Sequence, residues 1–187
     1  MPKDQAVGVF IDGSNFYFKL KDKEIGMKDL SKFDFRGLAK WLALNRKVNY
    51  CGYYIGVVKA KADNKKAQFL RKNQQKLFSH LSNKKQSIEI KRGFMMESDG
   101  KFHEKGVDVH LATDLLIGAY ENLWDTAIII SSDTDLIPAI KKVMQLGKKI
   151  EYIGFSHKPS YGLQKCATLT RLLIKEEVKP FEYRVNK

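Results

Sequence analysis

The sequence contains no apolar run that approaches the roughly 18 residues needed to span a bilayer, and no hydrophobic signal segment opens it. We therefore expect a cytoplasmic protein that does not associate with a membrane. Cysteine is scarce: Cys51 and Cys166 form no C-x-x-C pair, which disfavours both a disulfide scaffold and a structural zinc site. Cys51 lies in an apolar stretch, where a free cysteine usually serves as a small buried hydrophobe.

Histidine is also scarce, and its spacing carries no signal. None of His80, His103, His110 and His157 belongs to an H-x-x-x-H pair or to another metal-ligand pattern. We interpret all four as surface or packing residues. The chemistry of this chain is therefore expected to come from other side chains.

Positive charge, in contrast, is in excess. The chain has 34 Lys and Arg residues and 21 Asp and Glu residues, which gives a formal net charge of +13 and a pI near 9.6. Such a surplus attracts polyanions and speeds their encounter with the protein, so nucleic acid is a natural partner. The alternative is a lysine-rich surface that has no specific ligand.

Short apolar runs alternate with amphipathic segments along the 187 residues. Their periodicity predicts strands near 6–11, 48–58, 88–90, 127–130 and 150–153, and helices near 35–42, 63–81, 107–120 and 135–146. Asp63 is the expected cap of the second helix, residues 94–102 form an expected hairpin, and one or two short helices are expected in the tail up to 174.

Strands separated by helices of this length predict an α/β fold with a mainly parallel sheet that is covered on both faces. The nearly continuous apolar strands agree, because a sheet buried on both faces need not alternate. We expect a single domain over residues 1–187, with a core at about 6–175 and a short C-terminal tail.

Aspartates follow the predicted strands at the ends where an open parallel sheet binds its ligands. Asp12 follows the first strand, Asp133 and Asp135 follow the fourth, and Asp108 opens the central helix. Carboxylates gathered at one edge repel one another unless a cation lies among them, and their hard oxygens select Mg²⁺ or Mn²⁺. The pattern therefore predicts a divalent-metal site.

Each acid also has a local structural explanation. Asp12 could begin an Asx-turn, and the other three could be cap or first-turn acids of helices. That interpretation does not account for their convergence on one edge. Asp114 follows Asp108 by six residues, about 240° around an ideal helix, so it joins the site only if the site is wide enough for two ions. Otherwise Asp114 anchors a neighbouring segment.

Three segments in this order resemble the NYN domain, a branch of the PIN-like nuclease superfamily, and within it the LabA-like proteins. They are residues 9–15 (VFIDGSN), 105–116 (KGVDVHLATDLL) and 130–138 (ISSDTDLIP), and residues 147–150 (GKKI) fit as well. The likeness spans about residues 6–175. It implies a PIN-like, Rossmann-like three-layer α/β sandwich with the strand order 3-2-1-4-5, and an endoribonuclease activity that depends on Mg²⁺ or Mn²⁺.

The resemblance also implies a set of residues by position. The metal-binding and catalytic acids would be Asp12, Asp108, Asp133, Asp135 and Asp114. The residues that orient these acids would be Asn15, Ser131, Ser132 and Thr134. Ser132 departs from the family pattern, because many relatives have glycine there.

Basic residues crowd the helix predicted to begin near residue 63. Lys65, Lys66, Arg71 and Lys72 are candidates on that helix for following a phosphate backbone, and Lys105 is the candidate beside the metal site. The alternative is an ordinary solvated helix face.

Aromatic residues near the strand ends are candidates for stacking on unpaired bases. They are Tyr17, Tyr54 and Phe94, and the alternative is that they pack in the core or at its rim.

Three functions fit these observations. The first is metal-assisted hydrolysis of nucleic acid, with RNA as the expected partner and DNA as the alternative. The second is a nucleic-acid-binding regulatory module with little or no catalysis. The third is a phosphatase or nucleotide-processing enzyme, because carboxylates and Mg²⁺ suit any phosphoryl substrate, although the net charge favours a polymer. The sequence leaves open whether the chain acts alone or as a homodimer.

Overall fold

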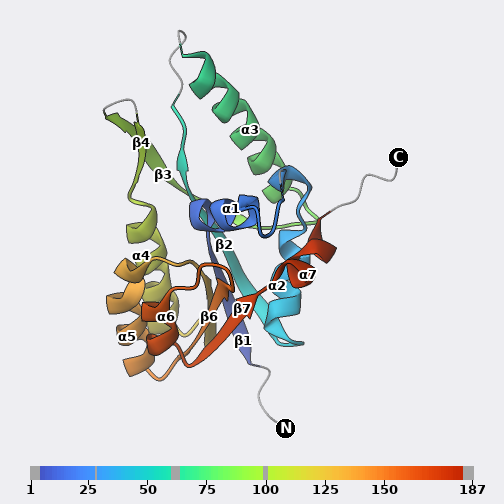
Figure 1. The fold of residues 1–187 in the computed structure, drawn as a ribbon. Helices are drawn as coiled ribbons and strands as arrows, with labels where there is room; N and C mark the ends of the chain where they lie inside the picture. Colours follow the sequence, from blue (N-terminus) through green and yellow to red (C-terminus); the bar gives the residue numbers. More distant parts are fainter. Residues whose placement is uncertain (1–4, 28, 60–63, 99–100, 183–187) are drawn as a thin grey trace.

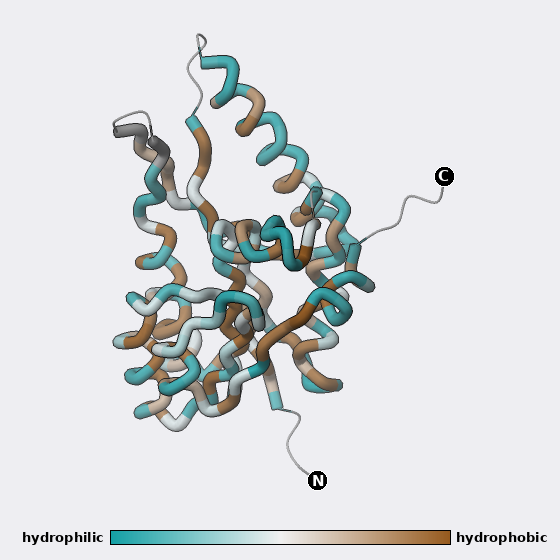
Figure 2. Tube along the Cα trace, viewed as in Figure 1, coloured by the Kyte–Doolittle hydropathy of each residue, from teal (hydrophilic) through white to brown (hydrophobic). Residues whose placement is uncertain are grey.

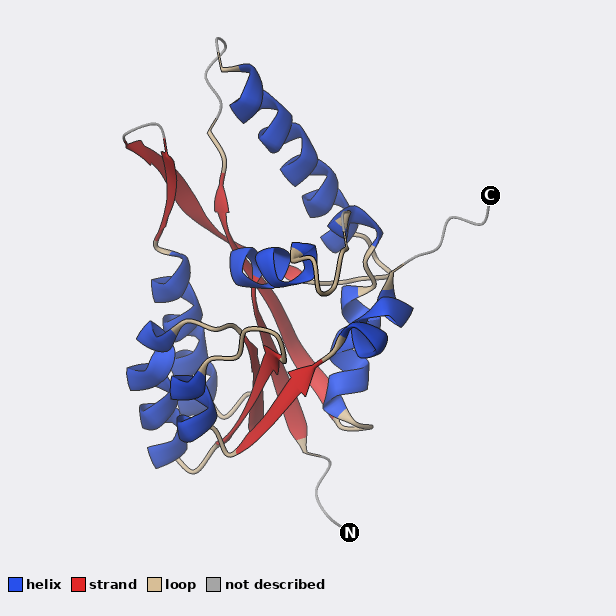
Figure 3. Cartoon of the chain, in the orientation of Figure 1, coloured by secondary structure: helices blue, strands red, loops and turns tan. Residues whose placement is uncertain are grey.

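The computed structural model describes residues 5–27, 29–59, 64–98 and 101–182. These residues form one seven-stranded sheet in the order β4-β3-β2-β1-β5-β6-β7 (Figures 1 and 3). The strands are β1 (Ala6–Asp12), β2 (Lys47–Val57), β3 (Glu89–Ser98), β4 (Lys101–Lys105), β5 (Thr126–Ile130), β6 (Lys149–Phe155) and β7 (Leu169–Leu173). Neighbouring strands are parallel except β3 and β4, which are antiparallel.

Helices cover both faces of this sheet (Figure 3). They are α1 (Gly13–Lys21), α2 (Phe35–Ala43), α3 (Lys65–Leu81), α4 (Val107–Tyr120), α5 (Ile137–Gln145), α6 (Tyr161–Cys166) and α7 (Lys175–Val178). Short 3-10 turns lie at Leu30–Lys32, Thr134–Leu136 and Lys179–Phe181. None of the helices in the described part of the chain is long and apolar enough to cross a membrane.

Buried side chains form two clusters, one on each face of the sheet. α1, α2, α3 and α7 contribute to the first cluster, and α4, α5 and α6 contribute to the second. β1 shows the division, because Val9 and Ile11 belong to the first cluster and Phe10 belongs to the second. Strand side chains alternate in this way with a period of two. Figure 2 shows hydrophobic residues along the strands, whereas α3 is mostly hydrophilic.

The expected strand order is confirmed in the centre of the sheet. The first five parallel strands along the chain lie as β3-β2-β1-β5-β6, which corresponds to 3-2-1-4-5. The sheet is wider by one strand at each edge, β4 and β7. We expected only short helices in the region of β7. Its sequence (LTRLL) is rich in leucine, which favours helices locally, but pairing with β6 fixes it as a strand.

Several boundaries also differ from expectation. β3 extends well beyond the strand expected near 88–90, and the expected hairpin is confirmed as the β3–β4 ribbon. Asp63 lies outside the described residues, and the side chain of Asn64 caps α3 by accepting the N–H of Ala67 at 2.9 Å. The helix expected at 135–146 begins as a 3-10 turn and then continues as α5.

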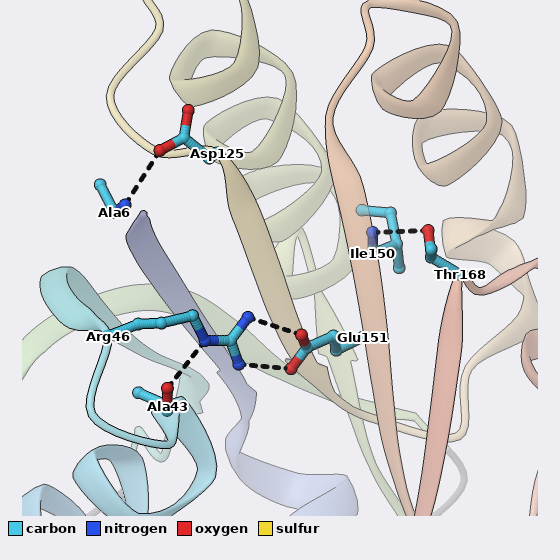
Figure 4. Close-up of polar contacts among 7 residues, drawn as sticks. All are labelled: Ala6, Ala43, Arg46, Asp125, Ile150, Glu151 and Thr168. Carbon is cyan, nitrogen blue, oxygen red and sulfur yellow. Dashed lines mark hydrogen bonds and ion pairs between the residues drawn. The ribbon is translucent and has the colours of Figure 1, made fainter. Parts of the chain in front are cut away.

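Polar contacts fix the amino edge of the sheet (Figure 4). The Arg46 guanidinium donates to both carboxylate oxygens of Glu151 at 2.6 and 2.9 Å and to the carbonyl of Ala43 at 2.7 Å. The N–H of Ala6 donates to Asp125 Oδ2 at 2.9 Å. These contacts lie at the edge opposite to the one where the predicted acids lie.

Two elements project beyond the carboxyl edge of the sheet (Figure 1). α3 follows the carboxyl end of β2, and the β3–β4 ribbon continues past the last β2–β3 pair, Val57 with Phe94. The carboxyl edge is therefore flanked by a basic helix and a two-stranded ribbon.

Candidate active site

Asp12 ends β1 and begins α1, at the carboxyl edge of the sheet. Its side chain is only 5% exposed, and it accepts the backbone N–H of Asn15 at 3.0 Å and the hydroxyl of Ser131 at 2.7 Å. Burial raises the pKa of Asp12 to about 6, although the two hydrogen bonds oppose this shift, and the charges of Asp108 and Glu104 raise it further. Asp12 therefore caps α1, but its burial disfavours the negatively charged form of its side chain.

Ser131 links Asp12 to the loop that follows β5. Its hydroxyl is buried, donates to Asp12 Oδ2, and accepts the backbone N–H of Asp133 at 3.0 Å. Asp133 Oδ1 in turn accepts the backbone N–H of Asp135 at 2.9 Å and caps the 3-10 turn. This chain of bonds fixes the aspartates of the loop relative to Asp12.

Asp108 lies in the first turn of α4. Gly106 precedes the helix with a φ of +80°, a conformation that suits glycine, and no side chain caps the helix there. Partial desolvation raises the pKa of Asp108, and the nearby charges of Asp133, Glu104 and Asp135 raise it further.

Glu104 is an acid of this region that sequence reasoning missed. Its Oε1 accepts the backbone N–H of Gly56 at 2.6 Å. A Cβ built on Gly56 would lie 2.9 Å from Glu104 Cγ and 2.8 Å from Met95 Sδ, so glycine leaves the space that Glu104 occupies. The only sequence signal was its position directly before the Lys105–Asp108 motif.

The fold thus brings Glu104 and Asp108 within electrostatic range of Asp12, and Glu104, Asp133 and Asp135 within range of Asp108. We call them the acidic cluster: Asp12, Glu104, Asp108, Asp133 and Asp135. None of the five forms an ion pair with a described Lys or Arg. Within the described residues, hydrogen bonds and not cationic side chains therefore stabilise the carboxylates of Asp12, Glu104 and Asp133.

The acidic cluster fits a hard divalent cation bound partly through water. Among the described residues, no three His, Cys, Asp or Glu side chains stand close enough to bind one ion together. Mg²⁺ does not need such a set, because it commonly keeps several waters and takes only one or two carboxylates. Burial is the main cause of the raised pKa of Asp12 and of Asp108, and neighbouring carboxylates add to it, so a bound cation would favour the charged form of both.

Asp114 lies in a different environment. Its Oδ2 accepts the hydroxyl of Tyr54 at 3.0 Å and that of Tyr50 at 3.4 Å, and it lies 3.3 Å from Lys91 Nζ. The structure therefore ties Asp114 to β2 and β3 instead of bringing it into the acidic cluster. We leave it out of the proposed metal set.

The supporting residues are placed unequally. Ser131 contacts Asp12 directly, and Asn15 does so through its backbone N–H. Ser132 and Thr134 lie in the same loop, but within the described residues neither side chain makes a hydrogen bond to an acid of the cluster. Their role as orienting residues stays a prediction.

The predicted nucleic-acid contacts are exposed. α3 has no acidic residue along its 17 residues, and its exposed cations include Lys65, Lys66, Arg71 and Lys72. Lys105 is exposed at the end of β4, three residues before Asp108.

The stacking candidates differ in exposure. Tyr54 is fully buried and bonded to Asp114, which agrees with the alternative of core packing and excludes it from stacking on a base. Tyr17 is partly buried against the core, and Phe94 is 51% exposed.

Comparisons with known proteins agree with this architecture. The family model of the NYN domain matches residues 6–173. The crystal structure of a protein of unknown function from Vibrio parahaemolyticus is similar with a TM-score of 0.61 and 18% identity, covering 92% of this chain and 95% of that chain. At this identity the likeness shows the fold alone. None of the curated proteins matches the sequence. Because the NYN match includes every member of the acidic cluster and nearly the whole chain, the protein belongs to the NYN domain family, within the PIN-like nuclease superfamily.

Proposed function

We propose that the protein is a metal-dependent endoribonuclease that hydrolyses RNA phosphodiesters. Membership of a nuclease-type family supports the reaction class, and the net charge of +13 supports a polyanionic substrate. The observation that carries the proposal is the acidic cluster, which gathers acids from β1, β4, α4 and the loop after β5 without an ion pair to a described Lys or Arg.

Mg²⁺ or Mn²⁺ would be bound directly by one or two of Asp12, Asp108 and Asp133, and the other acids of the cluster would accept hydrogen bonds from metal-bound waters. Such an ion supplies a water of lowered pKa and neutralises charge that develops on the phosphate. Ser131 keeps Asp12 and the Asp133 loop in a fixed relation through its two hydrogen bonds. Asp12 carries its negative charge above a pH of about 6, so it is ready for an ion at neutral pH.

The test is cleavage of a labelled RNA by purified protein with Mn²⁺ or Mg²⁺. Asp133→Asn should lower the rate by more than roughly 100-fold, since even the outer partners of metal ligands are worth 10–100-fold. The matched control is Asp125→Asn, the same substitution at the opposite edge of the sheet, which should leave the rate unchanged. Equal rates for the parent and a folded Asp133→Asn would end the proposal.

A nucleic-acid-binding regulatory module is the second candidate. The observation in its favour is that no three described side chains are already placed to bind one ion together. Calorimetric titration distinguishes the two candidates. Binding heat with Mn²⁺ or Mg²⁺ that disappears in Asp12→Asn supports the nuclease. The absence of binding heat with both ions supports the module. Parallel assays with DNA and mononucleotides test the substrate class.

A further inference from the structure

The β3–β4 ribbon has two chemically different faces. Residues directly opposite in an antiparallel pair lie on the same face, and the ribbon pairs Phe94 with Lys105 and Met95 with Glu104. One face therefore carries Met95 and Glu104, which is a member of the acidic cluster. Alternation along the strands assigns a second set of described residues to the other face: Arg92, Phe94, Met96, His103 and Lys105. We call this set the Phe94 face.

Contacts with neighbouring helices confirm this assignment of the faces. The Arg92 guanidinium lies 5.0 Å from the ring centroid of Phe78, which belongs to α3. Lys91, the adjacent residue, pairs with Asp114 of α4. The Phe94 face therefore points to the side of the sheet that α3 covers.

The Phe94 face is open and combines apolar with basic side chains. Phe94 is 51% exposed and Met96 is 53% exposed, and Arg92, His103 and Lys105 are exposed as well. A single exposed apolar residue needs no explanation. Here an aromatic ring and a thioether lie on one strand face among three basic side chains, and the face contains no acid among its described members.

The Phe94 face and the acidic cluster share the ribbon, on opposite faces of the same two strands. Glu104 belongs to the same two strands, and Lys105 leads through Gly106 to Asp108 at the start of α4. The ribbon also projects beyond the carboxyl edge of the sheet, as does the acid-free helix α3 (Figure 1). A strand of nucleic acid at the acidic cluster is therefore within reach of the ribbon.

We propose that the Phe94 face is a binding platform for unpaired nucleotides of single-stranded RNA. A base would stack on the Phe94 ring, and Arg92 and Lys105 would contact phosphates, because base stacking and phosphate neutralisation together provide binding without sequence preference. In duplex RNA the bases are stacked on one another, so Phe94 should not contribute to the affinity for a duplex. The choice of RNA rests on the proposed function.

The test measures binding without cleavage. A fluorescent 12-nucleotide single-stranded RNA is titrated with the full chain in EDTA, and the same strand in a duplex is titrated in parallel. Phe94→Ala should weaken single-strand binding roughly five- to hundredfold, the range of one lost base–aromatic contact, and should leave duplex binding unchanged. Phe94→Trp should restore the single-strand affinity.

The matched control is Tyr120→Ala. Tyr120 is 61% exposed at the last residue of α4, far from the ribbon and from α3, so its loss removes an exposed aromatic ring away from the proposed interface. It should change the single-strand affinity by less than twofold. Thermal melting of each variant shows whether the variant is folded.

Several results would overturn the platform. The first is unchanged single-strand affinity of a folded Phe94→Ala, and the second is an equal loss of affinity for the duplex. The third is self-association in sedimentation that depends on Phe94. The fourth is binding to phosphatidylserine vesicles that depends on Phe94 while RNA binding does not. Cleavage by the parent chain is scored separately. Normal cleavage without a Phe94 effect refutes only the platform, and Phe94-dependent binding without cleavage refutes only the nuclease.

Discussion

Asp12 is subject to opposing influences. Burial favours its neutral form, while hydrogen bonds from Asn15 and Ser131 favour the carboxylate. Burial prevails, so the pKa rises from 3.8 to about 6. The folded chain thus carries a buried negative charge at neutral pH, and a bound cation would relieve that cost.

Asp12→Asn should therefore stabilise the metal-free protein at pH 7.5. The raised pKa of Asp12 contributes stability below pH about 4, and this contribution is lost as the pH rises through about 6. The shift corresponds to about 3 kcal/mol, so the variant should exceed the parent in free energy of unfolding by about 2–3 kcal/mol at pH 7.5 and by nothing near pH 4.

Urea unfolding in EDTA at a series of pH values measures this difference. Asp125→Asn, an exposed carboxylate at the amino edge, is the control and should show no comparable dependence on pH. A difference between Asp12→Asn and the parent that stays constant from pH 4 to 7.5 would contradict the assignment.

Single residues of the site were predictable to different degrees. Asp12 and Asp133 follow apolar strand runs, so the rule that ligands lie at carboxyl ends located them. Glu104 was not predictable, because its bond to Gly56 depends on the register of β3 and β4 and on the missing Cβ of Gly56. Asp114 matched the family motif, but the tyrosines that engage it come from β2, which local sequence does not reveal.

At the scale of elements, the two edges of the sheet have different roles. The amino edge is fixed by Arg46, which is bonded to Glu151 with side-chain exposures of 18% and 14% (Figure 4). The carboxyl edge gathers acids that repel one another. The proposed site and the buried ion pair thus lie at opposite ends of the strands, so we expect that each can be altered without the other.

Arg46→Ala should destabilise the fold without affecting RNA cleavage. It leaves Glu151 mostly buried without its partner, which typically costs about 3 kcal/mol. Lys158→Ala breaks the ion pair of Lys158 with Asp22, and it should destabilise the fold much less because the Lys158 side chain is 65% exposed. Urea unfolding measures both, and equal effects of the two substitutions would contradict the account of the amino edge.

Elements were predictable where local pattern and tertiary context agree. α4 begins and ends at the expected residues because an apolar helical period and Gly106 both define it. β7 was missed because its leucines favour a helix, and only the open edge of β6 makes it a strand. The 3-10 turn before α5 forms because the side chain of Asp133 caps it. The spacing of apolar residues does not distinguish such a short turn from the first turn of an α-helix.

At the scale of the whole molecule, the net charge of +13 is distributed unevenly. α3 carries cations without acids, whereas the acidic cluster has no described cationic partner. Long-range attraction would bring RNA to the protein, and the local negative site would require a metal ion before a phosphate can approach.

The salt dependence of RNA binding should therefore depend on α3. Replacing both Lys65 and Lys66 by alanine should reduce the slope of log affinity against log salt concentration by about 1.4, at roughly 0.7 for each lost contact with single-stranded nucleic acid. The same double substitution at Lys141 and Lys142, an exposed pair on α5, should leave the slope unchanged. Identical slopes for both double variants would exclude α3 from the interface.

The most direct test of the metal site is a crystal soaked in Mn²⁺ and measured for anomalous scattering. Our account predicts an anomalous peak among Asp12, Asp108 and Asp133, and its loss in Asp133→Asn crystals soaked in the same way. A parent crystal with ordered aspartates and no peak between them would contradict the account.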